Sequence, residues 1–222
     1  MKQILLALAL LELPVSTAEA DLRYKMTLAV RTPSTALPPA DTVMLIKGDT
    51  IRIEHTQGAA RSVLLIRPDG QFVLDLGART YRRIPEIQTV LTSRAMAASP
   101  TFHRTGQFTT ILGLQAERVD ITMSVPLPIT PPPGLPTVLP VTGVLWVSDA
   151  YRAYARSIHR TIGLPGMPTS DLDGIVLRQV VRNAQFGIEI EHVVTELTET
   201  PLAAELFEVP EDFRVTGPAG RP

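Results

Sequence analysis

The sequence predicts an α+β protein, in which one strongly curved antiparallel β-sheet carries helices on one face. Three observations lead to this fold class. Apolar and polar residues alternate with a period of two over most of the chain, as in strands with one solvated side. Turn signals such as Pro68-Asp69-Gly70 separate the alternating segments. Two segments instead repeat apolar residues at helical spacing.

The segment 22–31 shows the strand pattern most clearly, because its even-numbered residues are apolar and its odd-numbered residues are mostly polar. About ten antiparallel strands at such spacing predict a half-barrel rather than a βαβ fold. The remaining strands are expected at 43–46, 51–55, 62–67, 71–76, 108–112, 115–125, 143–148, 175–182 and 186–197.

Helices are expected at 86–98, after Pro85, and at 150–162, where Asp149 can cap the start and Gly163 the end. Both segments are amphipathic, so each should lay its apolar stripe against the sheet. We therefore expect two or three helices that form a lid over one face.

The first twenty residues resemble a cleaved export signal. Lys2 precedes the apolar run 4–11, and Ala18-Glu19-Ala20 is a small-x-small cleavage site. The run is too short to span a bilayer, and no other segment approaches the ~20 apolar residues of a spanning helix. The sequence thus predicts a periplasmic protein that is soluble after cleavage, with no integral membrane segment in its mature form.

Residues 21–222 are expected to form a single domain. A proline-rich insertion is predicted at 126–140, because proline cannot donate a hydrogen bond to a strand ladder. A flexible tail is predicted at 217–222.

Composition excludes several classes of function. Lys and Arg number 21 against 22 Asp and Glu, which argues against binding nucleic acid or an anionic membrane surface. The absence of cysteine excludes thiol catalysis, disulfides and iron–sulfur clusters. Hydrophobic residues at 45% exclude a fully disordered chain.

No catalytic residue, metal ligand set or cofactor site is expected. The four histidines, at 55, 103, 159 and 192, are scattered, and no nucleophile, phosphate-binding or dinucleotide motif occurs. Glu189 and Glu191 share one strand face and are interpreted as its solvated side. The sequence therefore predicts a protein that is not an enzyme, and a hydrolase with an unrecognised site is the least favoured alternative.

Arg152, Arg156 and Arg160 form a stripe at i, i+4 and i+8 on the second expected helix. They are either a solvated face or a docking site for an anion or a protein partner. Like charges at this spacing repel each other slightly, so acidic neighbours or a partner are expected.

Several short motifs occur at turns and strand ends. They are Ile46-Lys47-Gly48-Asp49, Asp69-Gly70, Leu74-Asp75, Tyr81, Thr105-Gly106, Ile111-Leu112-Gly113, Leu145-Trp146-Val147-Ser148 and Leu206-Phe207-Glu208-Val209-Pro210. Together they resemble a family of secreted bacterial domains of unknown function, which is similar to the lipoprotein-sorting proteins LolA and LolB of the outer membrane. That resemblance implies an antiparallel half-barrel with a helical lid over an apolar cavity, and it brings no catalytic set.

This chain departs from the family in two respects. Leu114-Gln115-Ala116 stands where the family often has a cysteine, so no thiol role carries over. A lipid anchor is also not expected, which favours a soluble shuttle over a fixed acceptor.

The favoured function is a non-enzymatic periplasmic protein that binds an acyl chain, a lipid or a similar apolar ligand on the concave face of the sheet. The alternative is an envelope interaction or sensing module with a packed core and a protein partner. The expected lining of the cavity, chosen by alternation, is Leu28, Val30, Ile53, Leu74, Ile121, Met123 and Trp146.

Overall fold

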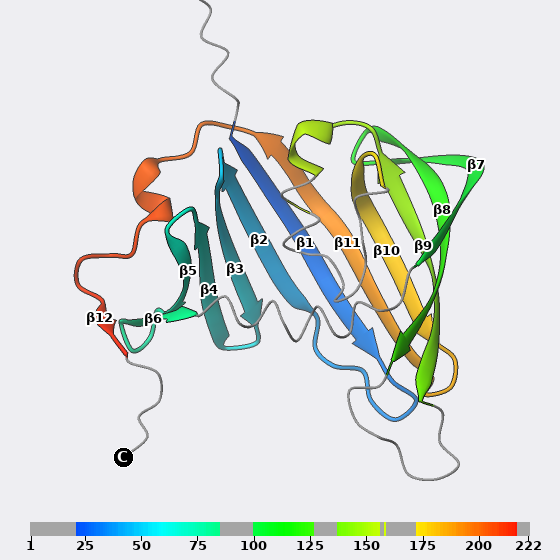
Figure 1. The fold of residues 1–222 in the computed structure, drawn as a ribbon, viewed down its shortest axis with the longest axis horizontal. Helices are drawn as coiled ribbons and strands as arrows, with labels where there is room; N and C mark the ends of the chain where they lie inside the picture. The colour runs from blue at the N-terminus through cyan, green and yellow to red at the C-terminus, as the bar shows by residue number, and fades with distance from the viewer. Residues whose placement is uncertain (1–20, 85–99, 127–136, 156–157, 159–171, 217–222) are drawn as a thin grey trace, which may run out of the picture.

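The computed structural model describes residues 21–84, 100–126, 137–155, 158 and 172–216, which form one curved twelve-stranded sheet (Figure 1). The strands are β1 (Leu22–Arg31), β2 (Ala40–Lys47), β3 (Thr50–Gln57), β4 (Ala60–Arg67), β5 (Gly70–Asp75), β6 (Thr80–Ile84), β7 (Thr101–Ile111), β8 (Leu114–Pro126), β9 (Val138–Ser148), β10 (Ile175–Asn183), β11 (Ile188–Glu199) and β12 (Arg214–Val215).

Two meanders build the sheet, whose strand order is β12-β6-β5-β4-β3-β2-β1-β11-β10-β9-β8-β7. Strands β1 to β6 follow one another in space as in sequence, and so do β7 to β11. The pairing of β1 with β11 joins the two meanders in the middle of the sheet. All pairs are antiparallel except β12 with β6. Tight hairpins connect several neighbouring strands, and Gly48 and Gly113 adopt the left-handed conformation in two of them, with φ of 53° and 77°.

Strand pairing assigns each side chain to a face, because residues directly opposite each other share one. On the face defined by Leu22, Tyr24 and Met26 lies the first buried cluster, which also contacts Ala155 and Ile158 of the helical residues. A second cluster, around Val119, Ile121 and Leu145, lies on the same face of β8 and β9. We call this face concave and the opposite face convex.

The third cluster lies on the convex face. Val63, Leu65 and Leu74 alternate away from the first cluster, and they pack against Val209 and Phe213 of the C-terminal segment. That segment contains the 3₁₀ helix η2 (Ala204–Phe207) and ends in β12. β12 pairs with β6 in parallel, so this short strand forms one edge of the sheet (Figure 1).

The curved antiparallel sheet expected from the sequence is confirmed, with additional strands. β6 and β12 were not expected, and β7 begins at Thr101 rather than at 108. The predicted insertion at 126–140 is shorter than expected, because β9 begins at Val138, and residues 127–136 lie outside the described residues. Pro140 is accommodated because it lies beyond the last β9–β10 pair, Arg182 with Thr142.

The expected lid of two or three helices is not confirmed. Residues 152–155 and 158 are helical within the expected segment 150–162, and η2 is a single short turn. Three expected segments lie outside the described residues: the helix at 86–98, the signal at 1–20 and the tail at 217–222. Within the described ranges, no helix is long and apolar enough to cross a membrane.

The third cluster generates the first prediction. Leu74→Ala should lower the free energy of unfolding by ~2–5 kcal/mol, because it removes a fully buried side chain from between the sheet and the C-terminal segment. Val215→Ala is the control, since Val215 is 65% exposed and its truncation should change stability by only ~0.5 kcal/mol or less. Urea denaturation measures both. Equal small effects would show that the C-terminal segment does not pack on the convex face.

Candidate ligand-binding face

The concave side of β1 changes from core to half-buried surface along its length. Leu22, Tyr24 and Met26 are buried at 0%, 3% and 7% exposure, whereas Leu28 and Val30, on the same face, are only half-buried. Their neighbour β11 repeats the change, from the buried Val194 to a half-buried end. We call the half-buried part of these two strands the apolar floor; it consists of Leu28, Val30, Ile188 and Ile190.

Two polar side chains lie beside the apolar floor. His192 is directly opposite Leu28 of β1 and Gln179 of β10, and Gln179 is in turn opposite Leu145 of β9. One row across four strands therefore consists of Leu28, His192, Gln179 and Leu145, with the two polar side chains between the two apolar ones. Both polar side chains share the concave face with the floor.

His192 is mostly buried, and this burial lowers the pKa of its imidazole below the ordinary value. Its neutral form therefore predominates at neutral pH. The neutral imidazole of His192 and the side-chain amide of Gln179 thus provide uncharged hydrogen-bonding groups beside the apolar floor.

A second polar contact lies in the neighbouring row, on β2 and β3. The hydroxyl of Thr42 and Nδ1 of His55 are 3.2 Å apart, and these residues are paired across β2 and β3. Thr42 in turn lies opposite Met26, whereas Leu28 lies opposite Ala40. The polar atoms of Thr42 and His55 therefore contact each other within the chain.

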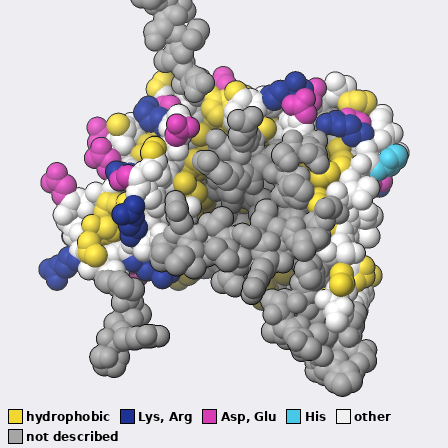
Figure 2. Space-filling model, viewed as in Figure 1, with side chains coloured by type: hydrophobic (Ala, Val, Ile, Leu, Met, Phe, Trp, Pro, Cys, Tyr) yellow, Lys and Arg dark blue, Asp and Glu magenta, His cyan; other side chains and the backbone are white. Residues whose placement is uncertain are grey.

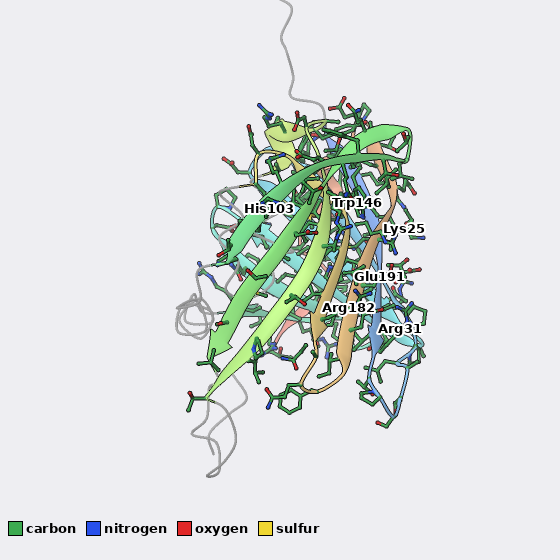
Figure 3. All side chains as sticks on the ribbon, turned by 90° about the vertical axis from the view of Figure 1, so that its right-hand side faces the viewer. Lys25, Arg31, His103, Trp146, Arg182 and Glu191 are labelled. Atoms are coloured by element: carbon green, nitrogen blue, oxygen red, sulfur yellow. The ribbon has the colours of Figure 1, made fainter. Side chains whose placement is uncertain are left out.

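The convex face of the same strands carries a charged ladder, defined as Arg31, Arg178, Arg182, Glu189 and Glu191. Arg31 contacts Glu189 at 2.5 Å and Glu191 at 3.2 Å. Arg182 reaches Glu189 and Arg178 reaches Glu191, each at 2.7 Å. Arg182 first, and then Arg31, lower the pKa of Glu189. Figure 3 shows Lys25, Arg31, Arg182 and Glu191 along this convex side of β1, β10 and β11.

The two faces therefore differ sharply in chemistry. On the side seen in Figure 2, charged side chains gather around the periphery, with hydrophobic ones among them. Glu189 and Glu191 lie on the solvated side, as their alternation predicts, and both are bound by arginines. The described Arg side chains of β1, β10 and β11 that form this ladder thus lie on the convex face, opposite the apolar floor.

The structure brings together most of the residues that the sequence selected. Leu28, Val30 and Ile53 lie on the concave face and are half-buried, and Ile53 packs against the first cluster. Ile121 and Met123 share that face but belong to the second cluster, with exposures of 1% and 9%. Those two side chains are thus packed core.

Two expected lining residues have different positions. Leu74 lies on the convex face in the third cluster, so the expectation that it shares a wall with Leu28 is wrong. Trp146 is opposite Arg118 and Arg178 in the strand pairing, and its partly buried ring packs against the first cluster. Leu74 and Trp146 each lie in a run of consecutive apolar residues, where the alternation of apolar and polar residues does not show which face a side chain is on.

The arginine stripe is described only at its first member. Arg152 contacts Asp173 at 3.0 Å and Asp149 at 3.6 Å, so acidic neighbours compensate its charge. Arg156 and Arg160 lie outside the described residues. Docking of a partner or an anion on this stripe stays a prediction.

A groove of about 480 Å³ lies between the β2–β3 and β4–β5 hairpins and η2. Both cations of its lining are paired within the chain: Lys47 contacts Asp21 at 2.7 Å, and Arg67 contacts Asp69 at 2.8 Å. Among the described residues, no group of three or more His, Asp or Glu side chains is placed to hold a metal ion.

Comparison with solved structures finds similar folds at low sequence identity. A LolA superfamily protein from Nitrosomonas europaea is 11% identical, with 85% of this chain and 90% of that chain covered and a TM-score of 0.37. The Mycobacterium tuberculosis lipoprotein LppX is 14% identical, with 81% and 88% covered and a TM-score of 0.37. An uncharacterized conserved protein from Thermus thermophilus is 12% identical, with 87% and 89% covered and a TM-score of 0.48.

These likenesses concern the fold alone, and none of the three reaches a TM-score of 0.5. No protein-family model matches the chain, and no curated protein matches it.

Sequence reasoning missed the polar pair of the concave face. It interpreted His192 as a surface or hydrogen-bonded histidine and did not select Gln179. A signal was present, since Gln179 occupies an apolar phase of β10 between Leu177 and Val181. A polar residue at a core phase marks either a hydrogen-bonded network or a binding group.

The burial of His192 predicts how stability depends on pH. Its folded pKa lies below the ordinary value of about 6.5, so the unfolded chain takes up a proton first as pH falls. The free energy of unfolding should therefore decrease between pH ~7.5 and ~5.5. His192→Gln should reduce this decrease, whereas His103→Gln, at an exposed edge position, should not. Denaturation series at both pH values test this, and identical pH slopes in all three proteins would contradict it.

Proposed function

We propose that this chain is a non-enzymatic periplasmic binding protein that holds the acyl chain of a lipid or a similar apolar ligand on its concave face. The observation that supports the proposal is the gradient along β1. Its apolar phase continues through Leu28 and Val30, beyond the point where the buried core of the sheet ends. Export through residues 1–20 belongs to the same proposal.

The apolar floor is informative because its residues are contiguous. Single hydrophobic residues at a surface are ordinary, but a continuous apolar patch indicates a binding surface. Val30 and Ile190 are directly opposite each other. Leu28 and Ile188 each lie two residues earlier in sequence on the same face, and they flank this pair on opposite sides because the strands are antiparallel. The apolar floor thus spans two hydrogen-bonded strands.

An acyl chain fits this surface energetically. Burying each methylene is worth ~0.8 kcal/mol, so a long chain can bind without a charged motif once the cost of association is met. The convex ladder could not offer this gain, because its arginines and glutamates are paired with each other. Binding of a simple chain also requires none of the catalytic groups that the sequence lacks.

Truncation of one floor residue and one core residue should separate binding from stability. Leu28→Ala should weaken binding of a fluorescent long-chain fatty-acid ester while costing little stability, since Leu28 is half-buried. Each lost methylene contact is worth ~0.8 kcal/mol, or about fourfold in Kd. Ile121→Ala should instead cost ~2–5 kcal/mol of stability, because Ile121 is fully buried.

Fluorescence titration measures the affinity, and urea denaturation measures the stability of the same samples. Phe108→Ala is the matched control for a surface hydrophobic residue, because Phe108 is 58% exposed on β7, away from the floor. Wild-type protein that binds no fatty-acid probe or lipid would overturn the proposal and favour the interaction module.

A further inference from the structure

We propose that the side-chain amide of Gln179 donates a hydrogen bond to the carbonyl oxygen of an acyl ester whose chain lies on the apolar floor. This inference rests on the proposed function and adds a polar group to the ligand. It makes Gln179 the residue that selects an ester over a plain hydrocarbon.

The amide nitrogen of Gln179 is buried and unused. Gln179 is 7% exposed, and its Nε2 has no hydrogen-bond partner among the residues that the structure describes. Buried polar groups are almost always paired, because leaving one unpaired reduces the folding equilibrium constant by about 5- to 150-fold. An orphaned donor on this face therefore calls for an acceptor that the described part of the chain does not supply.

Asn183 on the same strand provides an internal comparison. Its Nδ2 donates to the carbonyl of Pro140 at 3.2 Å, and its Oδ1 accepts from the backbone N–H of Phe186 at 2.9 Å. Both amides occupy the concave phase of β10 and both are buried. One is fully used to hold a strand end and the next loop, whereas the other donates to nothing in the described chain.

The position of Gln179 suits the end of an apolar chain. Gln179 is opposite His192, which is opposite Leu28 of the floor. Because neighbouring strands are ~4.8 Å apart, Leu28 lies about two strand spacings from Gln179. On β10 itself, Val181 follows on the same face and is opposite Ile190 of the floor. A chain that covers the floor can thus end with its polar group near Gln179.

The surroundings favour a neutral acceptor. The concave-face positions of β1, β9, β10 and β11 that the structure describes include no Lys or Arg, since Arg178 and Arg182 are on the convex face. An ionised carboxylate buried there would lack a counter-charge and would be costly. The carbonyl of an ester needs only a neutral donor, and the amide of Gln179 supplies one.

The test compares an ester with a hydrocarbon of similar length. Methyl palmitate and octadecane, both delivered from cyclodextrin, compete with a neutral fluorescent fatty-acid ester for wild-type protein, Gln179→Met and Gln115→Met. Methionine keeps the length of glutamine without its amide, and Gln115 is an exposed position on β8. Wild-type protein and Gln115→Met should bind the ester about 3- to 10-fold more tightly than the hydrocarbon, the value of one neutral hydrogen bond. Gln179→Met should lose that preference while keeping its affinity for octadecane.

The unliganded proteins give a second measurement. Gln179→Met should melt at the same or a higher temperature than wild type, because it removes an unpaired buried donor. A lower melting temperature would reveal an internal partner for Gln179 and overturn the inference. An unchanged ester preference in Gln179→Met would also overturn it, with the acyl-binding function intact. Failure of wild type to bind either compound would overturn both.

Discussion

The antiparallel pairing of β1 with β11 is the constraint on which the rest of the structure depends. It connects residues at opposite ends of the described chain, such as Leu22 and Glu199, and it joins two meanders that are otherwise built from local hairpins. Without it, each meander would expose an additional strand edge, and unpaired edges are sites of aggregation. The curved face on which the core and the apolar floor lie exists only because these two strands meet.

The two faces of this pair contribute differently to its stability. Arg23 contacts Glu196 at 2.8 Å on the convex side, but both side chains are about two-fifths exposed, and such pairs contribute only ~0–1 kcal/mol. Tyr24 on the concave side is buried, and its hydroxyl donates to the carbonyl of Val176 at 3.1 Å. Burial also raises the pKa of Tyr24. The pairing of β1 with β11 is therefore stabilised mainly by the buried side chains of the concave face. The ion pairs of the convex face contact specific partners across the two strands.

The same pair explains why the candidate ligand-binding face lies where it does. Toward one end, β1 and β11 are covered by the first cluster; toward the other, their apolar phase continues as the floor. The strand β10 then adds Gln179 next to His192. A half-buried apolar surface with one buried, unused donor is chemically suited to an acyl ester, whereas the convex ladder is occupied by its own ion pairs.

Much of the fold could be predicted from the sequence, because alternation and turn residues are local signals. The strand 22–31 was predicted with its bounds and both faces, and the hairpin at Gly48 with it. The predicted lining was right in face for Leu28, Val30 and Ile53 and wrong for Leu74. Phe72-Val73-Leu74 is apolar on both faces, because the C-terminal segment covers one of them.

What the sequence by itself determined is therefore the periodicity: where most of the strands lie, and which residues of a strand share a face. Only the tertiary structure decided which face is concave, where the core ends on β1, and that Gln179 comes to lie beside His192. The physical reason is distance along the chain. A period of two divides each strand into two faces, but partners far away in sequence determine which of those faces becomes buried.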